Sequence, residues 1–169
     1  MTEFEVIYKE YYQRVYAFLF RLCDHHDLAE ELTQETFYQA FTSMHRYQGN
    51  SEIFTWLASI AKHCYYKHLK KHRQNLQSTS VDMAADLLCV PDDENPELAL
   101  QRKDSIETVR KIINEMPEKY REVVILRLYA DLPFSQVAKA MNITENSAKV
   151  LYFRAKKMVM EALKNAYEM

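Results

Sequence analysis

The stretch LPFSQVAKAMNITENSAKVLYFRAKK, residues 132–157, decides how the second half of the chain folds. It predicts a short helix after Pro133, a turn at Asn142 and Ile143, and a longer helix that Thr144 caps. Asparagine tolerates the left-handed backbone conformation that such a turn favours. A short helix, a brief turn and a longer helix together form a helix-turn-helix.

The last helix, expected over about residues 145–166, has an apolar face and a basic face. The residues expected inside are Ala148, Leu151, Tyr152, Ala155, Met158, Val159 and Ala162. The residues expected outside are Lys149, Val150, Phe153, Arg154, Lys156 and Lys157. Such a helix can lie in the major groove of DNA, where cations contact guanine and apolar groups contact thymine methyls. The alternative is a bundle helix with a solvated basic face, and the preceding turn favours DNA.

Two further helices are expected before this motif. Asn95 and Pro96 are a cap and a first-turn proline, and the helix they open ends at Pro117. Pro117 then opens another helix that runs through Leu128. The first half of the chain predicts three more helices, over residues 4–22, from a cap near Asp27 to Met44, and from a cap at Ser51 to Arg73.

The second of these helices has a polar face opposite an apolar one. The expected inner residues are Ala29, Leu32, Thr36, Phe37, Ala40, Phe41 and Met44. The expected outer residues are Glu31, Gln34, Glu35 and Tyr38. The outer face is either ordinary solvated surface or a docking surface for a basic partner, and spacing alone favours the former.

The third helix combines basic, aromatic and hydroxyl side chains on its outer arc. The expected inner residues are Ile53, Leu57, Ile60, Ala61 and Cys64, and the outer ones are Thr55, Ser59, Lys62, His63, Tyr66, Lys70 and Arg73. Cations neutralise phosphates and aromatic rings stack on exposed bases, so this arc suits nucleic acid. The alternative is a basic helix end that complements the macrodipole, which would not account for Lys62 or Tyr66.

Composition excludes several classes of protein. Gly49 is the single glycine, and both tight hairpins and phosphate-binding loops rely on glycine's freedom at positive φ. Three cysteines, Cys23, Cys64 and Cys89, fit neither a disulfide framework nor a zinc site. The longest apolar run, residues 15–20, is far shorter than the roughly 20 residues of a membrane span. We expect no secretion signal, because no basic-then-apolar segment stands at the start. We therefore expect an all-α cytoplasmic protein without membrane insertion.

Charge divides the chain into three parts. Residues 1–73 carry nine basic and nine acidic side chains, and residues 105–169 carry eleven basic and eight acidic ones. Residues 74–104 carry seven acidic and two basic side chains, a net charge of −5. An acidic middle without helical periodicity is typical of a linker. The expected organisation is a helical domain over 1–73, an acidic flexible linker over 74–95 and a second small helical domain over 96–169.

Three segments together resemble a known family. Residues 27–37, DLAEELTQETF, resemble the core-binding segment of sigma region 2 in bacterial sigma factors. Residues 47–57, YQGNSEIFTWL, with Ile60 and Ala61, resemble the promoter-melting loop and helix of that region. Residues 132–157 resemble the helix-turn-helix of sigma region 4. The chain is thus similar, over residues 4–73 and 96–165, to the extracytoplasmic-function (ECF) sigma factors.

This resemblance implies a role for each surface. The implied partners are RNA polymerase core, through its β′ and β subunits, promoter DNA and an anti-sigma factor, with no cofactor and no metal. Core binding is implied for Glu31, Leu32, Gln34 and Glu35. Recognition of the melted −10 element is implied for Tyr47, Gly49, Asn50, Ser51, Lys62, His63 and Tyr66. Recognition of the −35 element is implied for Lys149, Val150, Phe153 and Arg154, with Lys156 and Lys157 beside them.

Two positions depart from the family pattern, and two other functions remain as alternatives. His63 stands where asparagine is usual and Leu151 where arginine is frequent, which affects promoter preference. A helix-turn-helix repressor or a response-regulator output domain would use the second domain alone, usually as a dimer that reads two half-sites. An enzyme would have to use histidines such as His25, His26 or His63. We expect no catalysis, because no carboxylate or cysteine is expected at a helix-compatible metal spacing from them.

Overall fold

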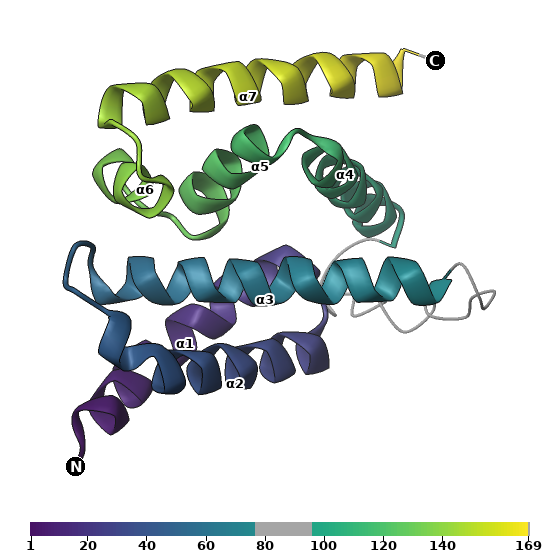
Figure 1. The fold of residues 1–169 in the computed structure, drawn as a ribbon. Helices are drawn as coiled ribbons and strands as arrows, with labels where there is room; N and C mark the ends of the chain where they lie inside the picture. Colours follow the sequence, from purple (N-terminus) through teal and green to yellow (C-terminus); the bar gives the residue numbers. More distant parts are fainter. Residues whose placement is uncertain (77–95, 169) are drawn as a thin grey trace. The chain divides into compact units, whose positions relative to one another are not determined.

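The computed structural model describes the backbone of residues 1–76 and 96–168, and side chains over 1–73 and 104–168. The chain divides into two compact units, Met1–Leu87 and Leu88–Met169. Figure 1 shows that the described residues are built from helices, without a strand. The all-α prediction is confirmed. The domain limits at 73 and 96 stay predictions, and most of the expected linker lies in 77–95, outside the described residues.

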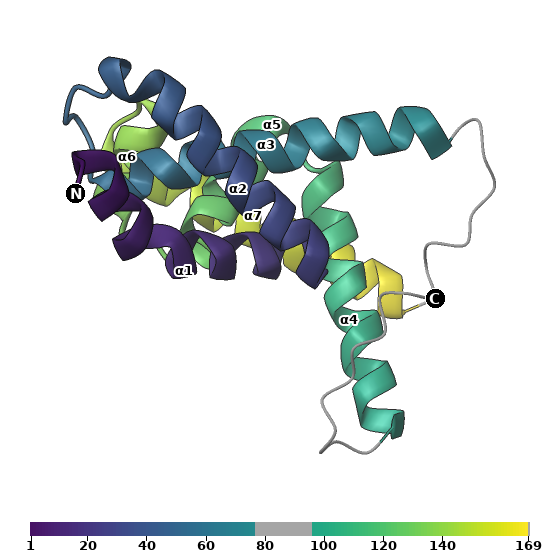
Figure 2. The ribbon, with the colours of Figure 1, turned by 90° about the horizontal axis from the view of Figure 1, so that it is seen from below.

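The first unit is a bundle of three helices, α1 (Glu3–Cys23), α2 (His26–Ser43) and α3 (Ile53–Leu76), with a short 3₁₀ turn, η1 (Met44–Arg46), after α2. Each helix contacts the other two, and Figure 2 shows the three helices from below. Val15, Leu19 and Leu57 are fully buried between them. The hydroxyl of Tyr65 on α3 donates to the carbonyl of Leu22 at 3.1 Å, which fixes α3 against the end of α1.

Two helix starts in this unit differ from the sequence prediction. His25, not Asp27, caps α2, because its Nδ1 accepts the backbone N–H of Leu28 at 3.0 Å. Asp24 ends α1 in the left-handed conformation (φ 51°), so only His25 separates it from α2. At α3, the carbonyl of Glu52 accepts the N–H of Trp56 at 3.1 Å. Glu52 therefore occupies the cap position expected for Ser51.

The second unit contains α4 (Pro96–Glu115), α5 (Glu118–Val124), η2 (Ile125–Tyr129), α6 (Phe134–Met141) and α7 (Glu145–Tyr167). Helices α4, α5 and α6 all contact α7. The unit's core contains fully buried Val123, Ile125, Leu126, Leu132 and Val137.

The segment η2 is a π-helix, whereas the sequence predicts that the helix from Pro117 continues through Leu128. The N–H of Ala130 donates to the carbonyl of Ile125 at 3.0 Å, a bond that spans five residues. The wider turn shifts the following side chains around the axis. Leu128, the end of the helix predicted from Pro117, lies in this turn and is 57% exposed.

The helix-turn-helix prediction is confirmed in detail. Asn142 adopts the left-handed conformation (φ 56°), and the N–H of Ile143 donates to the carbonyl of Ala138 at 3.0 Å. These features define a Schellman motif at the end of α6. Thr144 caps α7, because its hydroxyl oxygen accepts the N–H of Ser147 at 3.1 Å. Two local caps thus fix where α6 ends and α7 begins.

Candidate nucleic-acid and protein interfaces

The outer face of α2 is exposed as the sequence predicted. Glu31, Gln34 and Glu35 are exposed, whereas Leu32 between them is buried at 5% and packs into the core. Tyr38 extends this face and is 65% exposed. Phe41, expected inside, is 61% exposed, because its ring packs edge-on against Phe4 of α1 at 5.1 Å, outside the bundle core.

Two buried threonines on the inner side of α2 satisfy their hydroxyls within the helix. Thr33 donates to the carbonyl of Ala29 at 2.6 Å, and Thr36 donates to that of Leu32 at 2.7 Å. On the outer side, Gln39 Nε2 donates to Glu35 Oε1 at 3.0 Å. The carboxylate of Glu35 keeps further acceptor capacity, because an ionised carboxylate has about four lone-pair sites.

A cleft of about 250 Å³ separates the acidic face of α2 from the basic end of α3. Its lining residues are Glu31, Leu32, Glu35, Gln39, Cys64, Lys67, His68 and Lys71. Burial lowers the pKa of His68, and Glu31 acts against that shift. Burial also raises the pKa of the Cys64 thiol. One side of the cleft is therefore formed by the candidate protein-binding face of α2, and the other side carries cations of the candidate DNA-binding helix α3.

The tip of the loop between η1 and α3 lies in solvent. Gln48, Gly49 and Asn50 are exposed, and Gly49 has φ 75°. Tyr47 is half-buried at the base of this loop, where its hydroxyl donates to the carbonyl of Ser51 at 2.6 Å. Of the four loop residues predicted to contact DNA, Gly49 and Asn50 are therefore at the exposed tip, and Tyr47 and Ser51 are at its base.

The residues of α3 that were predicted to face DNA differ in their exposure to solvent. His63 is exposed, and Lys62 and Tyr66 are half-buried. Thr55, expected on this arc, is fully buried. Because α3 packs against both α1 and α2, its buried face is broader than predicted. The fully or nearly fully buried residues of α3 are Phe54, Thr55, Leu57, Ala58, Ala61, Cys64 and Tyr65.

The basic surface of α3 continues beyond these positions toward its C-terminus. Lys67, Lys70, Lys71 and Arg73 are exposed. The rings of His68 and His72 lie nearly parallel with centroids 6.1 Å apart.

On α7, every residue predicted to face DNA is exposed. The exposed set is Lys149, Val150, Phe153, Arg154, Lys156 and Lys157. Val150 is 42% exposed and Phe153 63%, so two apolar side chains stand among the cations. Lys149 lies 3.8 Å from Glu145, one turn earlier. Leu151 is half-buried, on the inner side as the sequence predicted.

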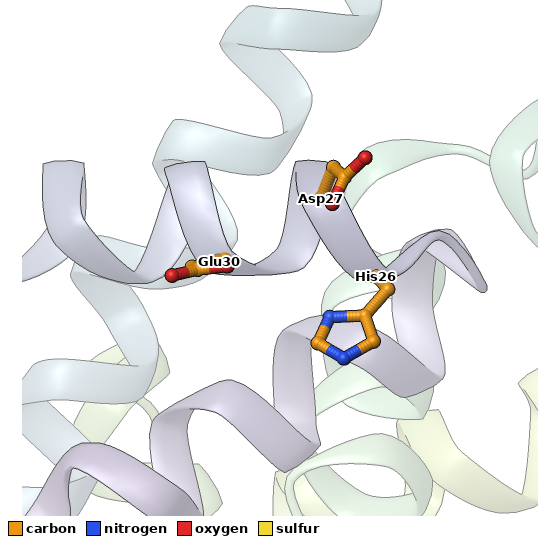
Figure 3. A group of neighbouring side chains, drawn as sticks. All are labelled: His26, Asp27 and Glu30. Carbon is orange, nitrogen blue, oxygen red and sulfur yellow. The ribbon is translucent and has the colours of Figure 1, made fainter.

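His26, Asp27 and Glu30 form a cluster at the start of α2 (Figure 3), with potential ligand atoms within 4.8 Å of one another. His26 and Glu30 are four residues apart, so the prediction that no carboxylate stands at a helix-compatible spacing from the histidines was wrong. All three side chains are exposed, and His26 Nδ1 is 2.7 Å from the Tyr16 hydroxyl. Asp27 complements the positive end of the helix dipole. These contacts give His26 and Asp27 roles in the local structure.

Both units match families of known proteins. Residues 7–75 match the family described as Sigma-70 region 2, and residues 106–159 match Sigma-70, region 4. The chain is 29% identical over 152 residues to the RNA polymerase sigma factor YlaC of Bacillus subtilis, covering 90% of this chain and 87% of that protein. It is 29% identical over 159 residues to the ECF RNA polymerase sigma factor SigM of Bacillus subtilis, covering 94% and 93%.

A solved structure shares the fold. The sigma factor RpoE of Bartonella quintana, solved in complex with the anti-sigma factor NepR, aligns with a TM-score of 0.61 at 20% identity and covers 97% of this chain and 98% of that one. With both sigma regions present in order, the chain belongs to the ECF RNA polymerase sigma factors. None of the helices in residues 1–76 and 96–168 combines the length and apolar character needed to cross a membrane.

Proposed function

We propose that this chain directs RNA polymerase core to a set of promoters and opens them, with one surface for each step. The observation that supports this proposal is the presence of both sigma regions in one chain, each with its expected polar face exposed. A repressor that used the helix-turn-helix alone would leave the exposed acidic and amide face of α2 without a function.

The outer face of α2 would bind the polymerase core. Glu31, Gln34 and Glu35 would contact the clamp coiled coil of the β′ subunit, and buried Leu32 would hold the helix behind them. Charge supports this assignment, because carboxylates desolvated against a basic partner form strong hydrogen bonds. The β subunit is expected to contact the second unit.

The loop and α3 would bind the melted −10 strand. The residues assigned are Tyr47, Gly49, Asn50, Ser51, Lys62, His63 and Tyr66. The exposed imidazole of His63 offers both a donor and an acceptor, so the base preference of this chain should differ from that of relatives with asparagine there.

The exposed side of α7 would read the −35 element. Lys149, Val150, Phe153 and Arg154 would contact base edges, and Lys156 and Lys157 would contact phosphates. Half-buried Leu151 takes no part in base reading, so recognition depends on fewer cations than in relatives with arginine at this position.

The proposal also includes a regulatory partner and the compartment in which the chain acts. Since the similar RpoE of Bartonella quintana was solved with an anti-sigma factor, we propose an anti-sigma factor for this chain, acting in the cytoplasm where polymerase meets DNA. The chain would act by binding and without a catalytic residue.

A run-off transcription assay tests the proposal. Purified core polymerase is incubated with genomic promoter fragments, with and without this chain, and transcripts are mapped. We expect specific start sites only when the chain is present. Transcription that stays unchanged, together with tight duplex binding by the free chain, would favour the repressor instead.

The free chain should bind promoter duplex weakly and depend on polymerase for affinity. Phosphate neutralisation supplies most non-specific DNA affinity, yet the whole chain has a net charge of −2. An anisotropy titration near physiological salt, with and without core enzyme, measures this dependence. Tight, sequence-specific binding without core would contradict it.

A further inference from the structure

We propose that Tyr47 and Trp56 are positioning residues that preform the loop of residues 48–50, so that its exposed tip meets an unpaired DNA base in a fixed conformation. The inference rests on the proposed role of this loop at the −10 element. It changes the part assigned to Tyr47, from a residue that contacts a base to one that holds the loop.

Three contacts close the base of the loop. The Tyr47 hydroxyl donates to the carbonyl of Ser51 at 2.6 Å, so a single hydrogen bond joins the two ends of the loop. The Tyr47 ring lies against Trp56 with centroids 5.0 Å apart and planes tilted by 36°. The backbone N–H of Tyr47 donates to the carbonyl of Met44 at 3.2 Å, which ties the residue to η1.

Both anchors are tied to regular structure. Tyr47 follows η1 directly, and Trp56 lies in the first turn of α3, where its N–H donates to the carbonyl of Glu52 at 3.1 Å. The contact between their rings therefore joins the end of one helical element to the start of the next. A phenol has one O–H to donate, and in Tyr47 that proton is used within the loop.

The tip of the loop, unlike its base, lies in solvent. Gln48, Gly49 and Asn50 are exposed, and a Cβ at Gly49 would meet no atom within 4 Å. Gly49 turns the chain at φ 75°, a conformation that glycine adopts without steric cost. The side-chain amides of Gln48 and Asn50 can both donate and accept, as recognition of a base edge requires.

Fixing the loop before binding favours binding. A mobile loop loses conformational entropy when it closes on a ligand, and a preformed loop has already lost it. Removing the Tyr47 hydroxyl should therefore weaken the capture of any base by about the same factor, because the effect comes from loop order and not from a base contact.

The first experiment uses the free, full-length protein and does not depend on sigma function. Trp56 is the single tryptophan of the chain, so its acrylamide quenching reports on this loop. Tyr47→Phe keeps the ring and removes only the hydroxyl, and Tyr12→Phe on α1 is the matched control. We expect faster amide exchange at Gly49 and Asn50 and stronger quenching of Trp56 in Tyr47→Phe, with Tyr12→Phe like the parent. Unchanged exchange and quenching in Tyr47→Phe would overturn the proposal.

The second experiment uses the complex with core polymerase and single-stranded DNA that carries the −10 element. We expect Tyr47→Phe to bind this strand about three- to tenfold more weakly, the usual net worth of one hydrogen bond. The loss should be equal for strands substituted at each −10 position. A loss that vanishes when one particular base is replaced would show a direct contact and overturn the positioning role. If the parent complex binds no such strand, the proposed function fails, while the exchange measurement still decides the state of the loop.

Discussion

The guanidinium of Arg127 donates to the backbone carbonyl of Leu132 at 2.9 Å. Between them the chain turns through Asp131, which has φ 55°. The same guanidinium lies 4.4 Å from the ring centroid of Phe134, the first residue of α6. One half-buried side chain in η2 therefore holds both the turn and the start of the helix-turn-helix.

Arg127→Met should lower the free energy of unfolding by about 1.5–3 kcal/mol, the range for a hydrogen bond to a charged group. Methionine keeps apolar bulk beside Phe134 but leaves the Leu132 carbonyl without this donor. Urea unfolding followed by helical circular dichroism measures the change, with exposed Lys139→Met as the control. An unfolding midpoint equal to that of the control would contradict the structural role.

Gln34→Ala combined with Glu35→Ala should weaken binding to core polymerase while leaving the fold intact. Both side chains are exposed, and surface substitutions usually change stability by at most about 0.5 kcal/mol. A pull-down titration with core measures affinity, and Glu10→Ala with Gln13→Ala on the exposed side of α1 is the matched control. Equal core binding by the two double variants would remove α2 from the interface.

Lys149→Ala and Lys156→Ala should have different effects at the −35 element. A base-specific contact by Lys149 is worth about 1–3 kcal/mol and is lost at one position. A phosphate contact by Lys156 weakens all sequences alike. Transcription from promoters varied at each −35 position separates the two. If Lys149→Ala reduced every promoter equally, Lys149 would be assigned to phosphate.

Stability should fall as the pH drops below the ordinary histidine pKa of about 6.5, because of His68. Burial lowers the pKa of His68 in the fold, so the unfolded chain takes up a proton at a higher pH than the folded chain does. The contribution of His68 is therefore complete above the unfolded pKa and is lost progressively toward the lower, folded pKa.

His68→Gln should flatten this pH dependence relative to the parent, and His45→Gln, at an exposed position in η1, is the control. Urea midpoints measured between neutral and mildly acidic pH provide the comparison. An identical slope in the parent and in His68→Gln would show that other groups cause the acid sensitivity.

Local signals predicted the elements best. Asn142 and Thr144 were predicted as turn and cap because both act through bonds to their own neighbours in sequence. The outer faces of α2 and α7 followed from helical spacing alone. The grouping of residues into two regions followed from the resemblance, which no single spacing would have provided.

The structure differs from the sequence prediction where tertiary packing or an unusual capping group determines the local conformation. Packing of α3 on two neighbours buries Thr55, and a π-helix over residues 125–129 replaces the predicted continuation of α5. Neither has a signal in the local pattern. The cap at His25 was missed because an imidazole nitrogen is an uncommon substitute for a cap oxygen. The bond between Tyr47 and Ser51 depends on how the loop closes, which spacing does not determine.

The fully buried side chains of helix α7 are its smallest ones. Ala148 and Ala155 are the residues of this helix that are fully buried, and Thr144 fixes where it starts. Changes at Lys149, Val150, Phe153 or Arg154 remove little buried apolar surface, so they cost the fold little. If this face reads the −35 element as proposed, duplicated copies of such a gene can acquire new promoters through a few codon changes on one helix face. The same property makes this face a suitable target for retargeting transcription by design.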